Sequence, residues 1–262
     1  MTLHRLHAMH SAGENIAVLT CYDAAFAQLL DQAGVDVLLV GDSLGMVVGG
    51  ERSTLKVSVD HMAYHTGCVA RGASLAWIVA DMPFGSYQQS PAPALQNAVT
   101  LMQAGAHMVK LEGGDWTIPA VEFLTERGIP VCGHLGFTPQ SVHALGGYRI
   151  QGRTEEAVEQ LLRQARDLAK AGAQMLVLEL VPAEVAAQVT QALSIPVIGI
   201  GAGRSCSGQV LVLHDMLGIN SGVAPRFVKN FLAANNSIAG AIRQYVEDVK
   251  EGRFPEDQLH GY

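Results

Sequence analysis

The chain has 262 residues, a length that allows one large domain or two smaller ones. Hydrophobic residues make up 49% of the chain and charged residues 16%, which provides material for a large core and excludes an extended disordered chain. The formal net charge is −7 and no basic run is present, so the composition gives no electrostatic footprint for nucleic acid or an anionic membrane. It favours an enzyme that acts on small molecules.

The N-terminal segment and the cysteines indicate a cytoplasmic protein. Residues 1–20 lack a basic flank followed by a continuous apolar stretch, so they do not resemble a secretory signal. No apolar run reaches the roughly 18 residues that a membrane helix needs. The four cysteines are far apart and form no Cys-x-x-Cys pair, which predicts reduced, mostly buried thiols.

A short pattern that joins a helix to a strand recurs along the chain. It is Ala-Gly-x-x followed by an apolar run, and it begins at Ala33, Ala104 and Ala171. Each time an amphipathic stretch ends at a glycine suited to a helix C-cap. The apolar run that follows is typical of a strand buried on both faces of a parallel sheet.

In chain order, the apolar runs predict eight strands that alternate with helices. The strands are predicted near 16–20, 35–41, 75–80, 108–111, 130–133, 174–178, 196–200 and 209–213. The helices between them are predicted at 22–33, 60–70, 92–104, 117–127, 154–171 and 183–193, with an extra helix outside the barrel over roughly 225–251.

This alternation predicts the α/β class and a (βα)8 TIM barrel. We expect a single domain over residues 1–262, with roughly 225–262 as a C-terminal helical extension, because no linker or composition break divides the chain. A doubly wound sheet is the alternative. It is disfavoured because no glycine fingerprint follows the first strand.

Ionisable residues end five consecutive predicted strands. They are Asp42 with its neighbour Ser43, Asp81, Glu112, His134 and Glu179. In a barrel the carboxyl ends of the strands face one mouth, so these carboxylates would converge. Carboxylates this close repel one another unless a cation compensates, and oxygen donors favour Mg²⁺ over Zn²⁺. The sequence therefore predicts a magnesium site.

Acidic residues at strand ends have a second interpretation as N-caps of the helices that follow. For Asp42 or Asp81 taken singly, a cap and a metal ligand are equally compatible with the sequence. Glu112 precedes a pair of glycines and Glu179 precedes an apolar segment, and neither is a good cap. The set as a whole favours a functional site.

Lys110 and His134 have two interpretations each. Lys110 lies two residues before Glu112, so on a strand both side chains project to the same side and reach the mouth. It would pair with a carboxylate or an anionic substrate because an unpaired buried lysine is costly, and a plain salt bridge to Glu112 is the alternative. His134 is either a hydrogen-bonded core residue or an additional catalytic residue.

Two further motifs have two possible interpretations each. His4, His7 and His10 recur at helical spacing, which fits a solvated helix face better than a metal site. The glycine-rich segment 199–203 follows the seventh predicted strand, where barrels often bind phosphate. A tight turn that needs small residues explains it equally well.

Several segments, taken in order, closely resemble the ketopantoate hydroxymethyltransferase family, and the resemblance covers nearly the whole chain. The segments are Val40-Gly41-Asp42-Ser43-Leu44-Gly45-Met46, Ala80-Asp81-Met82-Pro83-Phe84, Val109-Lys110-Leu111-Glu112-Gly113-Gly114, Val131-Cys132-Gly133-His134-Leu135-Gly136, Gly146-Gly147-Tyr148-Arg149-Ile150-Gln151-Gly152-Arg153, Ile198-Gly199-Ile200-Gly201-Ala202-Gly203, His214-Asp215-Met216-Leu217-Gly218 and Pro225-Arg226-Phe227-Val228-Lys229. Two residues depart from the family pattern, Ser207 where Asp is expected and Lys56 where Pro is usual.

The resemblance implies a (βα)8 barrel that uses Mg²⁺ and transfers a one-carbon group from 5,10-methylenetetrahydrofolate to 3-methyl-2-oxobutanoate. It implies a homo-oligomer, a decamer in the bacterial type. By matching positions, Asp42, Asp81 and Glu112 resemble the metal site, with Glu112 acting through water. Asp42, Ser43, Asp81 and Lys110 resemble the contacts to the 2-oxo acid, and Glu179 resembles the general base. No segment identifies itself as a pterin pocket.

Two other functions compete with this one. A Mg²⁺-dependent enolate-forming barrel of the phosphoenolpyruvate mutase and isocitrate lyase type would share the acids at the strand ends. It also expects a cysteine in a loop near the metal, and the sequence offers none at such a position. A barrel that only binds a ligand would have no need for Glu179 as a base.

Overall fold

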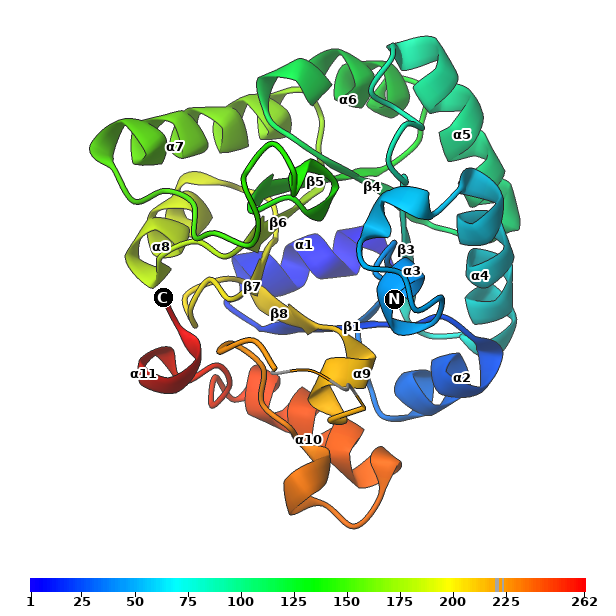
Figure 1. Cartoon of the computed structure of the whole chain (residues 1–262), viewed down its shortest axis with the longest axis vertical. Helices are drawn as coiled ribbons and strands as arrows, with labels where there is room; N and C mark the ends of the chain where they lie inside the picture. The colour runs from blue at the N-terminus through cyan, green and yellow to red at the C-terminus, as the bar shows by residue number, and fades with distance from the viewer. Residues whose placement is uncertain (220–221, 223) are drawn as a thin grey trace.

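Eight parallel strands close into a barrel in this computed structural model, which describes residues 1–219, 222 and 224–262 (Figure 1). Each strand pairs with its neighbour in the sequence, and the last pairs with the first. The strands are β1 Ile16–Thr20, β2 Val37–Val40, β3 Trp77–Asp81, β4 Met108–Glu112, β5 Val131–Gly136, β6 Met175–Glu179, β7 Val197–Ile200 and β8 Gly208–Leu211. The predicted TIM barrel is confirmed.

Side chains along each strand alternate between the inside of the barrel and the layer under the helices. On β2, for example, Val37 and Leu39 join the cluster inside the barrel, whereas Leu38 and Val40 join the larger cluster between strands and helices. Because both faces of the sheet are covered, the strands are continuous apolar runs.

Helices surround the barrel, and half of them begin at a side chain that caps the first turn. The ring contains α2 Ala24–Gln32, α4 Val59–Gly72, α5 Pro91–Ala104, α6 Ile118–Thr125, α7 Glu155–Lys170 and α8 Ala183–Ala192, each within a few residues of its predicted range. Asp23, Ser58 and Thr154 accept hydrogen bonds from backbone N–H groups one turn ahead and so fix three of these starts. Short helical turns lie in the loops at α3 Leu44–Val47, η1 Thr54–Lys56, η2 Asp115–Thr117 and η3 Pro139–Ser141.

A helix that precedes the barrel, α1 Leu3–Ser11, packs against the amino-terminal end of the strands. Leu6 and Met9 are buried and belong to the cluster inside the barrel. Nε2 of His7 lies 2.9 Å from the carbonyl oxygen of Gln174, and Nδ1 of His10 lies 2.8 Å from Oγ of Ser207. The predicted solvated face is therefore wrong for His7 and His10, because the same helical spacing directs them to the floor of the barrel.

The C-terminal region differs from the single helix predicted over residues 225–251. After α9 Leu213–Met216 and η4 Leu232–Ala234, the helix α10 Ile238–Lys250 begins only where Ser237 caps it, and a short α11 Asp257–His260 follows. Tyr245 of α10 is fully buried, and its hydroxyl lies 2.8 Å from the carbonyl oxygen of Val18. α10 therefore packs directly on β1 and covers the barrel where β8 meets β1.

All four cysteines are free thiols, and Cys21, Cys132 and Cys206 are buried, as predicted. Among the described residues, no helix is long and apolar enough to cross a membrane.

Candidate active site

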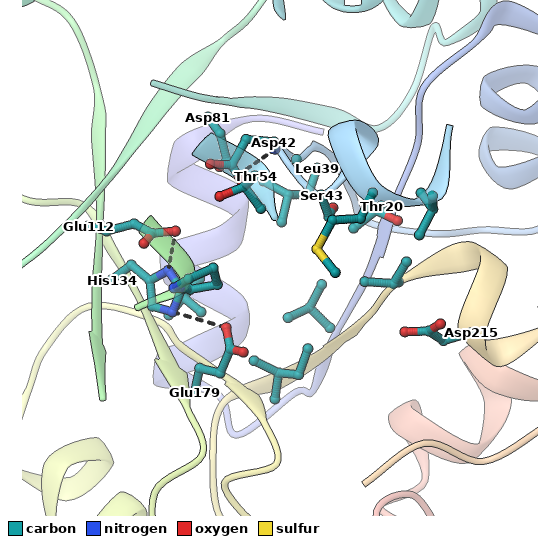
Figure 2. Close-up of a pocket in the computed structure, with 18 of the residues that line it drawn as sticks. Thr20, Leu39, Asp42, Ser43, Thr54, Asp81, Glu112, His134, Glu179 and Asp215 are labelled. Carbon is teal, nitrogen blue, oxygen red and sulfur yellow. Dashed lines mark hydrogen bonds and ion pairs between the residues drawn. The ribbon is translucent and has the colours of Figure 1, made fainter. Parts of the chain in front are cut away.

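A cavity of about 400 Å³ lies at the carboxyl ends of the strands. Figure 2 shows that the acidic side chains point into it from several strands. The residues around it that bear on chemistry are Thr20, Asp42, Ser43, Thr54, Asp81, Lys110, Glu112, His134, Tyr148, Glu179 and Asp215. Every candidate site residue that the sequence predicts therefore lines one cavity.

The strands bring these residues together by their register. Asp42 follows β2, Asp81 ends β3, and in the parallel register Asp81 lies beside Lys110 of β4. In the same way Glu112 at the end of β4 lies beside His134 of β5. Neighbouring residues in register project their side chains to the same face, so all of them reach the mouth.

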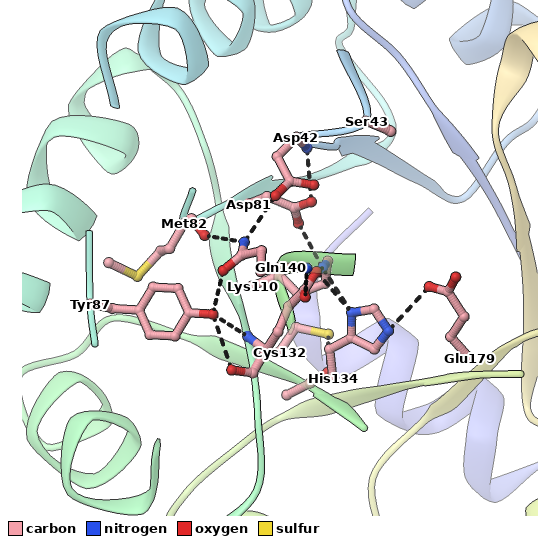
Figure 3. A network of polar contacts seen from close by, with 12 residues as sticks. Asp42, Ser43, Asp81, Met82, Tyr87, Lys110, Cys132, His134, Gln140 and Glu179 are labelled. Carbon is pink, nitrogen blue, oxygen red and sulfur yellow. Dashed lines mark hydrogen bonds and ion pairs between the residues drawn. The ribbon is translucent and has the colours of Figure 1, made fainter. Parts of the chain in front are cut away.

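The ionisable groups form one chain of contacts across the cavity floor (Figure 3). Nζ of Lys110 lies 3.1 Å from Oδ1 of Asp81 and 3.6 Å from Oε1 of Glu112. His134 continues the chain, with Nδ1 3.4 Å from Oε1 of Glu112 and Nε2 3.3 Å from Oε2 of Glu179. The prediction that Lys110 pairs with a carboxylate is confirmed, and it pairs with two.

Burial and neighbouring carboxylates raise the pKa values of Asp42 and Asp81. Burial raises the pKa of Asp42 well above its ordinary value, and the charges of Asp81 and Glu112 raise it further. Burial also raises the pKa of Asp81, although Lys110 opposes the shift. Both aspartates therefore lack enough positive charge beside them in the protein alone.

Burial and neighbouring charges also shift the pKa values of Glu112, His134 and Glu179. Burial opposes ionisation of Glu112, but Lys110 and His134 lower its pKa to about 2. Burial and Lys110 lower the pKa of His134, whereas Glu112 and Glu179 raise it, and the net result is about 9. The pKa of Glu179 is raised, chiefly because the side chain is buried, with only 12% of it exposed.

Gln140 belongs to the site although sequence reasoning missed it. It lies in η3, after β5, and only 5% of it is exposed. Its side-chain amide donates 2.9 Å hydrogen bonds to Oδ2 of Asp42 and to the carbonyl oxygen of Met82, while its backbone N–H donates to Oε2 of Glu112 at 3.0 Å. The hydroxyl of Tyr87 donates to Oε1 of Gln140 at 2.7 Å and fixes which way the amide faces. The sequence signal for the site is an ionisable residue at the end of a strand. Gln140 is neutral and lies in a turn, so it gives no such signal.

The aspartates are not helix caps. Asp42 bonds to Gln140, and Oδ2 of Asp81 accepts a 3.0 Å hydrogen bond from the backbone N–H of Asp42 rather than from a following helix. Ser43 occupies the N-cap position of α3 without a capping bond, and its hydroxyl shares a 2.8 Å hydrogen bond with Tyr22 instead. The cap interpretation therefore fails for both aspartates.

Backbone geometry places Glu179. The next residue, Leu180, has φ of 48°, a left-handed backbone conformation that residues other than glycine rarely adopt. Opposite, a Cβ on Gly136 would lie 2.2 Å from the carbonyl oxygen of Glu179. Glycine at that position therefore allows β5 to approach the end of β6 closely.

The glycine-rich segment after β7 fits the tight-turn interpretation. Gly201 and Gly203 have positive φ angles, and a Cβ on Gly203 would lie 2.4 Å from Cβ of Ala183. The turn is packed against the start of α8.

The two departures from the family pattern lie away from the acids. Ser207 precedes β8 at the floor, where its Oγ accepts a 3.0 Å hydrogen bond from the N–H of Val197. Lys56 forms an exposed ion pair with Glu51. Both affect only local structure.

The donor set at the mouth fits a divalent metal. Oδ1 of Asp81 is buried and has no hydrogen-bond donor, since its contact with Lys110 lacks hydrogen-bond geometry. Asp42, Asp81 and Glu112 lie around one lysine, Lys110, and burial together with the neighbouring carboxylates raises the pKa of both aspartates, so a bound cation would stabilise their ionised forms. Among the described residues no three His, Cys, Asp or Glu side chains surround one metal position, so Asp42 and Asp81 would leave the other positions to oxygens of substrate and water.

A closed barrel with a buried carboxylate and lysine site at its carboxyl-terminal mouth defines a class, the TIM-barrel enzymes that act on small molecules. Comparison with known proteins narrows the class. Residues 1–257 match the sequence model of ketopantoate hydroxymethyltransferase. The chain belongs to this family and is an enzyme of the transferase class.

Curated relatives agree over the full length. A 3-methyl-2-oxobutanoate hydroxymethyltransferase of Paracidovorax citrulli (strain AAC00-1) is 60% identical over 267 residues, which cover 100% of this chain and 90% of that protein. Another of that name from Burkholderia vietnamiensis (strain G4 / LMG 22486) is 61% identical over 255 residues, covering 97% of this chain and 94% of the relative.

Solved structures of lower identity share the fold. A phosphonopyruvate hydrolase in complex with oxalate and Mg²⁺ superposes with a TM-score of 0.62 at 14% identity, covering 95% of this chain and 96% of that one. A phosphoenolpyruvate phosphomutase from Streptomyces platensis subsp. rosaceus has a TM-score of 0.61 at 14% identity and covers 98% and 100%.

Proposed function

We propose that this enzyme transfers a hydroxymethyl group from 5,10-methylenetetrahydrofolate to 3-methyl-2-oxobutanoate and so makes ketopantoate for pantothenate biosynthesis. The printed names of relatives at about 60% identity support the activity. The observation that carries the chemistry is the placement of Glu179 across His134 from the Asp81–Lys110–Glu112 cluster. The proposed base and the carboxylates proposed to bind the cation thus line one cavity.

Asp42 and Asp81 would hold Mg²⁺ directly, and Glu112 would act on it through water. When bound, Mg²⁺ supplies a Lewis acid that withdraws electron density from the 2-oxo group and acidifies the neighbouring C3–H. The structural neighbour with oxalate and Mg²⁺ supports this choice, because its ligand is also a small acid with adjacent oxygens. The oxygen-only donor set supports it as well.

The remaining steps belong to the side chains of this chain. Ser43 and Lys110 bind the 2-oxo acid, and the ammonium group of Lys110 stabilises the negative charge that develops on it. Glu179 takes the proton from C3, and its raised pKa suits a base that works near neutral pH. The nucleophilic C3 attacks the one-carbon unit of the folate and a C–C bond forms. Both carbon–nitrogen bonds to the folate break, water supplies the hydroxyl oxygen, and the two folate nitrogens take up one proton from that water and the proton held by Glu179.

His134 has a positioning role in this scheme. It contacts Glu179 through Nε2 and Glu112 through Nδ1, so it orients the base relative to the cluster. It is also the next candidate for the base if Glu179 is not.

A phosphoenolpyruvate mutase or isocitrate lyase type of reaction is the second candidate, supported by the shared fold. Such chemistry expects a cysteine near the metal, and the described residues that line the cavity include none. Cys132 lies on β5 beside Lys110 but does not line the cavity, and burial raises the pKa of its thiol to about 12. A thiol in that state is not a reactive acid or nucleophile.

Proton NMR of 3-methyl-2-oxobutanoate in D₂O tests the proposal. With enzyme and Mg²⁺ but no folate, we expect loss of the C3 proton signal, and EDTA should abolish the loss. Addition of 5,10-methylenetetrahydrofolate should then give ketopantoate. Absence of both exchange and product would favour the mutase and lyase substrates instead.

Two further properties follow from the proposed function. The enzyme would act in the cytoplasm as a homo-oligomer, a decamer, as the family resemblance implies. Light scattering of the purified chain gives the number of subunits directly, and a monomer at working concentration would contradict it.

A further inference from the structure

A second cavity of about 730 Å³ adjoins the first. The two cavities share Tyr148, Glu179, Pro225 and Phe227 as lining residues, so they meet beside Glu179. In Figure 2 the Glu179 carboxylate points into the first cavity, toward His134. A molecule in the second cavity would therefore lie next to the group that we propose as the base.

The second cavity has a positive lining in an acidic protein. Arg149 and Arg153 line it, and Glu179 has the sole acidic side chain among its described lining residues. Both arginines are exposed, and within the described part of the chain neither guanidinium forms an ion pair or a hydrogen bond. Since the whole chain carries a net charge of −7, two unpaired arginines here would concentrate anions locally.

The same cavity has aromatic walls. Tyr148, Phe227 and Tyr262 line it, and Tyr148 packs against Phe137 with ring centroids 4.7 Å apart. Aromatic side chains recognise flat rings by stacking or by edge contacts. The lining thus combines surfaces for a flat ring with two free cations for carboxylates.

The first cavity is the smaller of the two and contains the acidic cluster. It has room for a small 2-oxo acid, but a conjugated pterin with an anionic tail is much larger and would meet like charge there. The second cavity has the larger volume and the opposite sign of charge.

Resting on the proposed function, we propose that this second cavity is the subsite of the one-carbon donor. The fused ring lies among Tyr148, Phe227 and Tyr262, the methylene group faces Glu179, and the glutamate carboxylates pair with Arg149 and Arg153. This arrangement brings the two reacting carbons together where the cavities meet.

The test uses Arg149→Gln, Arg153→Gln and the double variant, with Arg166→Gln on the exposed face of α7 as the matched control. The KM for 5,10-methylenetetrahydrofolate should rise about five- to tenfold in the double variant, because exposed pairs with carboxylates are individually weak. A donor with a longer polyglutamate tail should show a larger rise. Arg166→Gln should leave the KM unchanged.

Deuterium exchange at C3 of 3-methyl-2-oxobutanoate without folate separates this subsite from the proposed function. It should remain at the wild-type rate in all three cavity variants. An unchanged donor KM in the double variant, with exchange intact, would place the donor elsewhere and overturn the subsite.

Binding of 5-formyltetrahydrofolate, measured by calorimetry, gives a readout that needs no turnover. If the wild type shows neither exchange nor product, the proposed reaction fails. Binding of this analogue that weakens in the double variant and not in Arg166→Gln would still support the subsite. No binding to the wild type, or equal binding to both, would contradict it.

Discussion

The side-chain amide of Gln140 donates a 2.9 Å hydrogen bond to Oδ2 of Asp42, across 98 residues of sequence. The backbone N–H of the same residue donates to Glu112, so one turn after β5 holds two carboxylates that otherwise repel each other. Tyr87 prevents the amide from rotating, because its hydroxyl donates to the carbonyl oxygen of that amide. The geometry of the acidic cluster therefore depends on a neutral residue.

Replacement of Gln140 by Ala should weaken the cluster without unfolding the barrel. The loss of a buried, charge-assisted hydrogen bond is worth about 1.5–3 kcal/mol, so we expect the Mg²⁺ concentration for half-maximal C3 exchange to rise roughly 10- to 100-fold. Gln160→Ala on the exposed face of α7 is the control. Tyr87→Phe should shift the Mg²⁺ dependence in the same direction by a smaller factor. A lower rate at saturating Mg²⁺ with an unchanged half-maximal concentration would show that Gln140 does not position Asp42.

Glu179→Gln should retain binding of Mg²⁺ and the 2-oxo acid but lose proton exchange at C3. The expected deficit is on the order of 10²–10⁴-fold if Glu179 is the general base, because the amide cannot accept the proton. Glu184→Gln, on the first turn of α8, is a nearby control and should exchange normally. Near-normal exchange in Glu179→Gln would assign the base to another residue, with His134 examined next.

Asp42→Ala and Asp81→Ala should weaken the Mg²⁺-dependent part of substrate binding. Calorimetry of 3-methyl-2-oxobutanoate with and without Mg²⁺ separates that part, and we expect it to fall roughly tenfold or more in each variant. Asp81→Ala also removes the charge that raises the pKa of Asp42, so this variant should not be severely unstable. Unchanged Mg²⁺-dependent binding would place the metal elsewhere.

Asp31 stabilises the fold far from the site. This buried residue at the end of α2 accepts hydrogen bonds from the backbone N–H groups of Ser74, Leu75 and Ala76 and from the hydroxyl of Ser74. These bonds fix the loop that leads into β3. Asp31→Asn should lower the free energy of unfolding by about 2–4 kcal/mol, measured by urea denaturation at pH 7.

The pH dependence of that effect has a definite sign. Burial opposes ionisation of Asp31, but its backbone donors lower the pKa below the ordinary value. A carboxyl whose folded pKa is lowered adds stability above its unfolded pKa and loses it as the pH falls through the folded pKa. The difference between wild type and Asp31→Asn should therefore be largest above about pH 4 and shrink below it. Glu159→Gln, on the exposed face of α7, should show no such difference, and a difference for Asp31→Asn that is constant down to pH 2 would contradict this account.

The barrel could be predicted because its signals are local. Each apolar run is buried on both faces. Each junction between a helix and a strand has a glycine or a capping residue, and that residue type indicates the backbone conformation at the junction. The acids could be grouped because parallel strands bring their carboxyl ends to one edge whatever the exact register. Asp81 and Lys110 are neighbours for that reason alone.

The parts that could not be predicted depend on contacts between distant segments. Gln140 is polar, neutral and in a turn, and only the fold reveals that Asp42 is its partner. The packing of α1 against the barrel was not predicted, because its histidines indicated a solvated face. Leu6 and Met9 are too few to indicate a buried face. The start of α10 was misplaced because residues 225–237 contain apolar residues without helical structure around most of them.

α1 also determines which end of the barrel gives access to the candidate site. It closes the amino-terminal end of the barrel, and the space that remains beneath Lys110 is only about 10 Å³, the size of a single water probe. Among the described residues, the cavity at the opposite end of the barrel is therefore the route to the candidate site. If the small acid binds deepest and the donor nearer the opening, as proposed, the acid would bind before the donor, and the product would leave after the spent donor.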